Sequence, residues 1–509
     1  MTASIPPAVE LRGLTKRFGS VLANTGVNLR VEAGTIHGVI GENGAGKSTA
    51  MKILYGTLRP DEGEIFIAGR KRVWSAPSDA IAAGVGMVHQ HFMLAGPYSA
   101  LDNILLGAEP VRSGMIDRAG ARERLEVLAR QYGLPVEWDR PVEELPVGVQ
   151  QRLEILKLLY READILILDE PTAVLTPKET NDLFCNLKQL RAQGKTVLLV
   201  THKLQDVMSS TDHVTVLRAG RVTGELETAR TNPQGLANLM VGRKVVLNIE
   251  VPPARPRVET ALEVEALTLA GAGGSRQRLS GVSFVVRREE IVGVAGVEGN
   301  GQSELLQAIL HPHDSRARTA GTVRICGEDV TACGTARIRQ LGVAVIPEDR
   351  QQEGLLLERP VRENFLLGLQ RNPVFCHAGF LGLKELTRTA ASAVAEYDVR
   401  PPDLTLPAGK LSGGNQQKLI VAREFQHQPQ LLIAAQPTRG VDVGAIEFVH
   451  TRIVRARDDG AGVLLVSSEL DEILTLSDRI LVMFGGRIVA QFRRGEVTAR
   501  ELGLKMGGA

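Results

Sequence analysis

The sequence has few of the features that mark secreted, disulfide-stabilised or membrane-spanning proteins. Only four cysteines occur in 509 residues, Cys185, Cys326, Cys333 and Cys376, and no two of them form a CxxC pair. Such sparse cysteines favour small buried thiols in a reducing compartment and give no spacing for a structural metal site. No apolar run approaches the roughly 18 residues that a membrane-spanning helix needs. The start, MTASIPPAVELRGL, lacks the basic and then apolar pattern of an export signal. The sequence therefore predicts a cytosolic protein, in which any membrane role depends on a partner.

Excess charge of either sign is also missing. Lys and Arg number 60 and Asp and Glu number 58, which leaves a formal net charge of +2. This balance creates no whole-protein field for nucleic acid or for an acidic membrane surface, so we expect no nucleic-acid partner. At about 150 residues per domain, the length predicts about two to four domains.

The chain contains an internal repeat. The stretch ILILDEPTAVL at 165–175 recurs as LLIAAQPTRGV at 431–441, and TVLLVTHKLQDV and DNILLG recur in the same order as GVLLVSSELDEI and ENFLLG. Between the copies, NIEVPPARPRVET is rich in proline, which favours a short stiff linker. We therefore predict a boundary near residues 243–258, with a first domain at 1–245, a linker at 246–258 and a second domain at 259–509.

Each half alternates apolar, β-branched runs with helical patterns such as ARERLEVLARQYG. This alternation is typical of a mostly parallel sheet that is covered by helices on both faces. The predicted fold class is therefore α/β in each half.

The first half carries a complete glycine-rich phosphate-binding loop, GENGAGKST. It follows the apolar run TIHGVI and precedes the helical pattern STAMKILYG, which is the strand, loop and helix context that the motif requires. Backbone N–H groups of such a loop converge on phosphate oxygens, and the helix N-terminus adds partial positive charge. We expect Lys47 to reach the β and γ phosphates and the Ser48 hydroxyl to ligate Mg²⁺. The residues of the predicted nucleotide loop are Gly41, Glu42, Asn43, Gly44, Ala45, Gly46, Lys47, Ser48 and Thr49.

Two adjacent carboxylates end a later apolar strand, ILILDEP. The strand should deliver Asp169 and Glu170 to the carboxyl edge of the sheet, where open α/β folds bind their ligands. Asp169 is suited to hold Mg²⁺ through its water shell, and Glu170 is suited to polarise an attacking water.

These motifs, in this order, resemble an ATP-binding cassette (ABC) ATPase with two cassettes fused in tandem, and the match covers nearly the whole chain. The resemblance implies two nucleotide-binding domains, each with a RecA-like, mostly parallel core, an antiparallel β subdomain and a helical subdomain. It identifies Gln90 in MVHQHFML as the glutamine of the glutamine loop and a further Mg²⁺ ligand. It also identifies His202 in LLVTHK as the switch histidine and Phe18 in TKRFG as the aromatic that stacks on adenine.

Family members pair their cassettes head to tail, so that ATP lies between the phosphate loop of one cassette and the LSGGQ signature of the other. The second half matches this signature in LSGGNQQK at 411–418, whereas LPVGVQQR at 145–152 is altered. The resemblance thus implies one complete site, in which the catalytic Lys47, Gln90, Glu170 and His202 and the metal ligand Asp169 face Ser412, Gly413, Gly414 and Gln416. Pairing within one chain and pairing with a second copy both stay open.

The other combination of halves departs from the family at each matching position. Gln302 replaces the lysine, Glu348 the loop glutamine, Ala435 and Gln436 the Asp–Glu pair, Ser468 the histidine, and Pro146 and Val147 the first residues of the signature. Without a lysine, and without an acidic pair to hold Mg²⁺, the negative charge of a triphosphate is poorly compensated. We therefore predict one hydrolytic site per chain.

The degenerate second half, with GVEGNGQSEL, IPEDR and QPTRGVDVGA, resembles the ATPase subunits of bacterial importers for simple sugars and nucleosides. The pair Ala435–Gln436 and the stretch VHQHFML favour the nucleoside group. The resemblance implies ATP and Mg²⁺ as cofactors, two integral-membrane permease subunits as partners and an extracytoplasmic solute-binding protein as an indirect partner. It also implies a peripheral position on the cytoplasmic side of the inner membrane, with the permease contacting the segment after Gln90 through DNILLG.

Three other functions fit the sequence less well. A soluble tandem-cassette ATPase that acts on ribosomes would carry a longer, charged helical linker and two competent sites. A DNA-repair cassette would carry a long heptad insertion or paired zinc-ligand cysteines. An ATP sensor without turnover would not need a complete Glu170 and His202.

Overall fold

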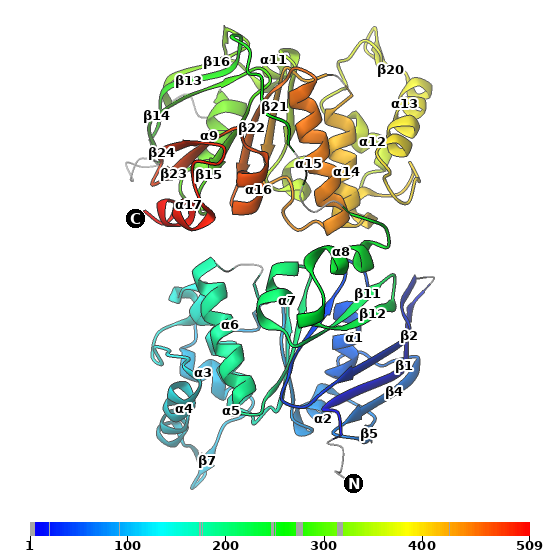
Figure 1. The fold of residues 1–509 in the computed structure, drawn as a ribbon, viewed down its shortest axis with the longest axis vertical. Helices are drawn as coiled ribbons and strands as arrows, with labels where there is room; N and C mark the ends of the chain where they lie inside the picture. The colour runs from blue at the N-terminus through cyan, green and yellow to red at the C-terminus, as the bar shows by residue number, and fades with distance from the viewer. Residues whose placement is uncertain are drawn as a thin grey trace. The chain divides into compact units, whose positions relative to one another are not determined.

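The structure is a computed structural model that divides into two compact units, Met1–Val245 and Val246–Ala509 (Figure 1). It describes residues 6–508 except 20, 91, 173, 174, 176, 246–248, 250, 271–277, 313–318 and 427. Part of the predicted linker 246–258 therefore lies outside the described residues.

A six-stranded sheet forms the core of the first unit. Its strands lie in the order β12 (Arg221–Glu227), β11 (His213–Arg218), β3 (Ile36–Ile40), β10 (Thr196–Thr201), β9 (Ile165–Asp169) and β6 (Val85–Val88). The last four of these pair in parallel, and all of their residues are buried. Because both faces of this parallel sheet are covered, its strands are mostly apolar instead of alternating between apolar and polar residues.

Successive residues of strand β9 enter two different hydrophobic cores. Ile165 and Ile167 pack with a second, antiparallel sheet and with helix α1 (Lys47–Leu54), whereas Leu166 and Leu168 pack with a helical group. The antiparallel sheet has the order β2 (Val21–Val31), β1 (Val9–Phe18), β4 (Glu62–Ile67) and β5 (Arg70–Arg72). Since side chains of a strand alternate between its faces, Asp169 shares a face with Ile165 and Ile167 and points toward α1.

Helices and short strands complete the first unit. They are α2 (Pro77–Ala82), α3 (Ala100–Leu105), β7 (Val111–Arg112), β8 (Met115–Ile116), α4 (Arg118–Tyr132), η1 (Val142–Glu144), α5 (Val147–Tyr160), α6 (Pro177–Ala192), α7 (Leu204–Ser210), η2 (Thr228–Arg230) and α8 (Pro233–Val241). In Figure 1 the antiparallel sheet and the helical group α3, α4 and α5 lie on opposite sides of this unit.

The second unit repeats this topology strand for strand. Its core sheet has the order β24 (Arg487–Arg493), β23 (Arg479–Phe484), β15 (Ile291–Ala295), β22 (Gly462–Ser467), β21 (Leu431–Ala435) and β18 (Val343–Ile346). Its antiparallel sheet has the order β14 (Leu279–Arg287), β13 (Thr260–Leu269), β16 (Thr319–Ile325) and β17 (Glu328–Asp329). The predicted α/β fold, with a mostly parallel core and an antiparallel and a helical part in each half, is confirmed.

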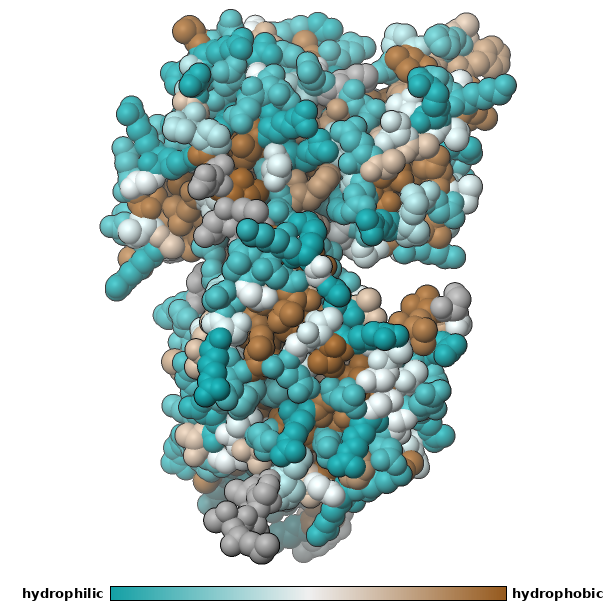
Figure 2. Space-filling model, turned by 45° about the vertical axis from the view of Figure 1, so that its right-hand side comes forward, coloured by the Kyte–Doolittle hydropathy of each residue, from teal (hydrophilic) through white to brown (hydrophobic). Residues whose placement is uncertain are grey.

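The remaining elements of the second unit follow the same plan. They are α9 (Gln302–Leu310), α11 (Thr335–Gln340), η5 (Arg350–Gly354), α12 (Val361–Leu366), β19 (Cys376–His377), β20 (Phe380–Leu381), α13 (Leu383–Glu396), η6 (Ala408–Lys410), α14 (Gly413–Glu424), α15 (Val443–Asp458), α16 (Leu470–Leu476) and α17 (Ala499–Met506). The face seen in Figure 2 mixes polar residues with scattered apolar groups. Within the described ranges, every helix is too short or too polar to cross a bilayer.

Candidate functional site

Four parallel strands of the first unit bring the predicted residues to one edge of the sheet. Strand β3 leads into the loop Gly41–Gly46, and strands β6, β9 and β10 end just before Gln90, Glu170 and His202. Because the carboxyl ends of parallel strands meet at one edge, residues far apart in the sequence gather there, at the usual place of a ligand site.

The glycine-rich loop encloses the ammonium group of Lys47. Lys47 Nζ donates to the carbonyl oxygen of Gly41 at 2.7 Å and to that of Glu42 at 3.0 Å, and the residue is only 5% exposed. Gly46 caps helix α1 with a φ of 97°, which a residue with a side chain rarely adopts. A Cβ atom at Gly46 would also lie 2.4 Å from the carbonyl oxygen of Ala23. The loop therefore holds a buried cation at a helix N-terminus, where anions bind.

Asn24 supports this loop and was not predicted. Its Nδ2 atom donates to the carbonyl oxygen of Gly46 at 3.1 Å, and the residue is fully buried. Asn24 belongs to no motif in the sequence of strand β2, so only the fold reveals its contact with the loop.

Ser48 and Asp169 lie together beside the loop. Ser48 Oγ donates to Asp169 Oδ1 at 3.2 Å. Burial raises the pKa of Asp169, and the hydrogen bond from Ser48 opposes that shift. A hydroxyl and a carboxylate are ligands that Mg²⁺ accepts when phosphate oxygens and water complete its shell. Across the part of the chain that the structure describes, no group of three or more His, Cys, Asp or Glu residues could hold a metal ion.

Glu170 is held by two of the other predicted residues. Its Oε1 atom lies 3.0 Å from His202 Nδ1, and its Oε2 atom accepts a hydrogen bond from Gln90 Nε2 at 3.1 Å. The hydrogen bond with His202 lowers the pKa of Glu170 more than burial raises it. Glu170 is therefore an ionised, oriented carboxylate, which is the form that can accept a proton from water.

The backbone at Glu170 is strained. Its φ is 49°, in the left-handed region, and its N–H donates to the carbonyl oxygen of Val200 at 2.8 Å. A residue with a side chain pays about 1–3 kcal/mol for such a conformation, which persists only where the surrounding structure enforces it. Here the bond to the neighbouring strand β10 directs the side chain toward His202 and Gln90.

The remaining predicted residues of the first unit occupy more ordinary positions. Phe18 ends strand β1 and is 47% exposed, with Lys16 Nζ 5.7 Å from the centroid of its ring. Ala45 N–H donates to the carbonyl oxygen of Glu42 at 3.0 Å, which closes the turn of the loop, and Gly44 has a φ of 81°. Asn43 and Thr49 are half-buried at the loop and in the first turn of α1.

The second unit keeps the shape of the loop without its cation. Gln302 Nε2 donates to the carbonyl oxygen of Val297 at 3.2 Å, just as Lys47 donates to Glu42 at the matching position of the first loop. Gln302 is 7% exposed, and its amide oxygen has no hydrogen-bond partner among the described residues. Its neutral side chain therefore fills the place of the lysine without supplying charge.

The acidic pair is also missing from the second unit. Ala435 takes the place of Asp169 and belongs to an apolar cluster, with 2% of its surface exposed. Gln436 takes the place of Glu170, and its Oε1 atom accepts hydrogen bonds from the N–H of Ser468 at 3.1 Å and from Ser468 Oγ at 3.2 Å. Neither side chain can bind a cation strongly or act as a base.

The predicted signature residues form a separate group in the second unit. Ser412 caps helix α14, and its Oγ atom accepts hydrogen bonds from Asn415 Nδ2 at 2.8 Å and from Asn415 N–H at 3.4 Å. Gln416 is buried and donates to the carbonyl oxygen of Ala408 at 3.2 Å. A Cβ atom at Gly414 would lie 2.6 Å from Asp442 Oδ2, so the carboxylate packs directly on the helix backbone. In the first unit Pro146 caps the matching helix α5 without a side-chain hydrogen bond.

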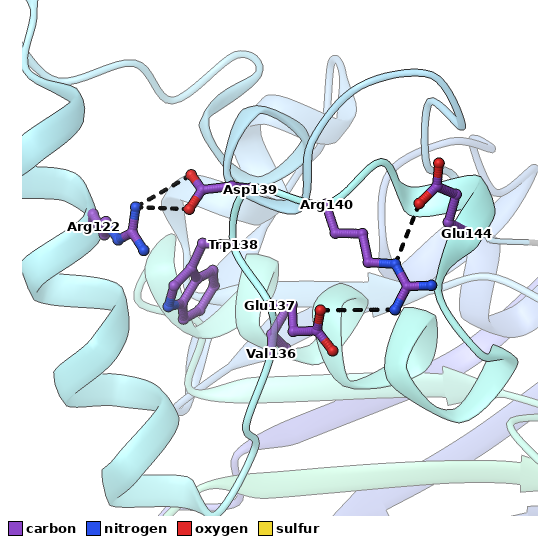
Figure 3. A pocket seen from close by; sticks show the side chains of 7 residues that line it. All are labelled: Arg122, Val136, Glu137, Trp138, Asp139, Arg140 and Glu144. Atoms are coloured by element: carbon purple, nitrogen blue, oxygen red, sulfur yellow. Dashed lines mark hydrogen bonds and ion pairs between the residues drawn. The ribbon is translucent and has the colours of Figure 1, made fainter.

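A shallow pocket of about 550 Å³ lies elsewhere on the first unit (Figure 3). Its charged side chains pair with one another: Arg122 with Asp139 at 3.0 Å, and Arg140 with Glu144 at 3.3 Å. It contains none of the predicted residues, and its charges are already compensated, so we assign it no role.

Comparison with known proteins agrees with this geometry. The family model described as "ABC transporter" matches residues 24–173 and 279–439. A nucleoside import ATP-binding protein of Lactococcus lactis subsp. cremoris is 44% identical, and the match covers 98% of each chain. A guanosine import ATP-binding protein of Bacillus subtilis is 45% identical over 98% of this chain and 97% of the relative. A glucose import ATP-binding protein of Haloferax volcanii is 42% identical over 99% of this chain and 96% of the relative.

The family match accounts for both halves of the chain. One matched range contains the phosphate loop and the Asp169–Glu170 pair, and the other contains the loop at Gln302 and the signature at Ser412. The prediction of a tandem ATP-binding cassette ATPase is therefore confirmed: the chain belongs to the ABC transporter family.

Proposed function

We propose that this chain is the ATP-hydrolysing subunit of an importer for nucleosides or simple sugars and that it contains one competent ATP site. That site takes its phosphate loop and acidic pair from the first cassette, residues 1–245, and its signature from the second cassette, residues 259–509. The two cassettes pair either within one chain or with a second copy.

One observation carries the proposal, namely the complementary distribution of intact parts. The first unit holds the cation Lys47 and the oriented Glu170, but its helix α5 is capped by a proline in place of the serine. The second unit holds the capped Ser412 helix, but its loop carries neutral Gln302. Since family members join the loop of one cassette to the signature of the other, only one combination is complete.

The first-unit residues have distinct tasks in this site. Lys47 and the loop N–H groups bind the β and γ phosphates, and Phe18 supplies an exposed ring for adenine. Ser48, Gln90 and Asp169 hold Mg²⁺, which when bound offsets phosphate charge. Glu170 orients the attacking water and accepts its proton, while His202 fixes the carboxylate. Removing one such group costs about 10²-fold or more in rate.

The segment after Gln90 through DNILLG, which ends at Gly107, is the proposed contact for the permease subunits. Met93, Tyr98 and Leu106 are each more than 60% exposed on it. Asn103 holds the segment by accepting from Ala95 N–H at 2.7 Å and donating to the Ala95 carbonyl oxygen at 3.0 Å. Glu154 accepts from Met93 N–H at 2.7 Å and so ties the segment to helix α5. A fixed loop with exposed apolar side chains suits a protein contact.

The relatives support the proposed solute class, since they are named as import proteins for nucleosides, guanosine and glucose. The higher identities belong to the nucleoside and guanosine importers, and we therefore favour nucleosides. The alternative of a ribosome-acting ATPase has no support among these relatives.

Co-expression with candidate permeases tests the proposal. The chain should sediment with membranes only when the permeases are present, and nucleosides with their binding protein should stimulate its ATPase in liposomes. Recovery with ribosomes instead, and no stimulation by any nucleoside or pentose, would contradict the proposal.

A further inference from the structure

Arg350 begins a π-helical turn, η5, for which the described residues of the first unit show no counterpart. The segment from Glu348 to Asn364 is three residues longer than the matching segment from Gln90 to Asn103. Both segments end alike, since Asn364 Oδ1 accepts from Leu356 N–H at 2.7 Å as Asn103 does from Ala95. The extra residues therefore fall in the turn. Such π-helical turns are rare and frequently lie at functional sites.

The guanidinium of Arg350 joins three segments of the second unit. Its Nη1 donates to the carbonyl oxygen of Arg439 at 2.6 Å, and its Nη2 donates to that of Gly440 at 3.2 Å. Its Nε donates to Gln416 Oε1 in helix α14 at 3.4 Å. Nη2 also lies 2.7 Å from the position that a Cβ atom would take at Gly413. One planar fork thus spans η5, the signature and the loop 439–442.

The charge of this fork has no carboxylate partner. No ion pair to Arg350 occurs among the residues that the structure describes, and its acceptors are carbonyl and amide oxygens. Burial lowers the pKa of Arg350, which nearby Asp349 partly offsets, but an arginine remains cationic in proteins. A positive charge therefore stands beside Gly413, at the N-terminus of α14, where it adds to the attraction of that terminus for an anion.

We propose that Arg350 is a positioning residue for ATP hydrolysis. Arg350 fixes the signature Ser412–Gln416 and the loop 439–442 in place relative to each other. Its positive charge lies beside them. Together they would face the γ-phosphate that is bound at Lys47 of a first cassette. This inference rests on the proposed function, because the signature contacts a phosphate only if it pairs with the phosphate loop of a first cassette.

The test uses the full chain with its permeases in liposomes. Arg350→Ala should lower kcat about 10-fold or more, because small displacements of phosphate-contacting groups are costly, while KM for ATP and photo-labelling of the first unit stay within about twofold. Arg350→Lys should recover less than half of the lost kcat, because a compact ammonium cannot span Gln416 and two carbonyl groups. Arg388→Ala, which removes an exposed arginine whose one ion-pair partner among the described residues is Glu385, is the matched control and should leave kcat unchanged.

Hydrogen exchange separates positioning from general loss of stability. Arg350→Ala should speed amide exchange in 412–416 and 439–442 and leave strands β15 and β21 protected. Exchange that rises throughout the second unit, wild-type kcat in Arg350→Ala, or full recovery by lysine would each overturn the inference. Ser412→Arg is run in parallel. If Ser412→Arg also leaves kcat intact, the proposed pairing itself fails, whereas an inactive Ser412→Arg beside an unaffected Arg350→Ala sinks only the role of Arg350.

Discussion

The residue that follows strand β9 in the first unit and strand β21 in the second has a strained backbone in both units. Only the first unit has a carboxylate there. Glu170 has a φ of 49° and its N–H bonds to Val200, while Gln436 has a φ of 44° and its N–H bonds to Val466. The strain therefore belongs to the topology, because both units form the same bond to the neighbouring strand. The chemistry belongs to the side chain, and the two can be lost separately.

The same lesson holds at the phosphate loop. Gly46 and Gly301 have left-handed φ values of 97° and 108°, and Gln302 reproduces one of the two loop hydrogen bonds of Lys47. The second unit has thus kept a folded loop while replacing the only cation in it. Four experiments can break or sharpen this contrast, and they follow in order of expected effect.

Glu170→Gln should have the largest effect. The amide keeps the shape but cannot accept a proton, so turnover should fall about 10²-fold or more while ATP binding is retained. ATPase rate and nucleotide binding in the assembled transporter measure both. Gln436→Glu is the matched control in the second unit and should leave the rate nearly unchanged. If Glu170→Gln kept about half of the activity, both sites would turn over and the one-site proposal would be wrong.

Substitutions in the signature of the second unit should reduce ATP hydrolysis almost as much as removal of Lys47 from the first unit. Ser412→Arg and Gly413→Asp should damage hydrolysis about as much as Lys47→Ala, because all three act on the same γ-phosphate. A Cβ atom at Gly413 would lie 2.7 Å from Arg350 Nη2 and 3.1 Å from the carbonyl oxygen of Gly440, so a side chain there would displace the Arg350 guanidinium. ATPase assays of each variant in the transporter are the measurement.

The control for these variants is the other combination, namely the altered signature of the first unit and the phosphate loop of the second. Substitution of Val147, or Gln302→Lys, should change hydrolysis little, since Ala435, Gln436 and Ser468 would still lack the required groups. A second active site in Gln302→Lys would show that the charge of the loop alone decides competence.

Nucleotide affinity should differ between the units by a smaller factor. A hydrogen bond to a charged group contributes about 1.5–3 kcal/mol, so loss of the lysine should weaken binding by roughly 10- to 150-fold. Photo-labelling with an azido-ATP at low concentration, followed by proteolysis, should mark the first unit preferentially. Equal labelling of both units would contradict this expectation.

Acid sensitivity comes last because it concerns the stability of each unit and not its rate or affinity, and it should also distinguish the two units. His37 in β3 is buried, and burial, followed by the nearby His213, lowers its pKa from 6.5 to about 4. Its Nε2 atom lies 2.8 Å from Thr215 Oγ1. The unfolded chain therefore binds a proton between pH 6.5 and 4 that the folded unit does not. Stability is fully present above about pH 6.5 and falls, as the pH drops to about 4, by about 3 kcal/mol.

The second unit has Val292 and Leu481 at the matching positions and should lack this sensitivity. Calorimetry or hydrogen exchange at pH 7 and pH 5 should show a larger loss in the first unit. The double variant His37→Val/Thr215→Leu should remove the difference. An unchanged acid response in that variant would assign the sensitivity to other groups, such as the surface carboxylates.

Much of the site was predictable because its motifs are local. GENGAGKST needs only its own glycines and the following helix to make a phosphate loop, and ILILDEP needs only strand periodicity to place Asp169 on the face of α1. Gln90 and His202 came from the family resemblance and not from a local motif, and the structure places both within hydrogen-bond distance of Glu170.

The sequence by itself determined the repeat, the α/β class and the difference in catalytic motifs between the two halves, because each depends on residue type and spacing within short segments. Only the tertiary structure decided the strained backbone of Glu170, the support of Gly46 by Asn24 and the fork of Arg350 across three segments. Those features arise where the sheet brings together residues that lie tens of positions apart. Gln90 and Glu170 are separated by 80 residues, and Arg350 and Gly440 by 90. No local pattern encodes such contacts, since hydrogen bonds at this range form only after the strands have packed in register.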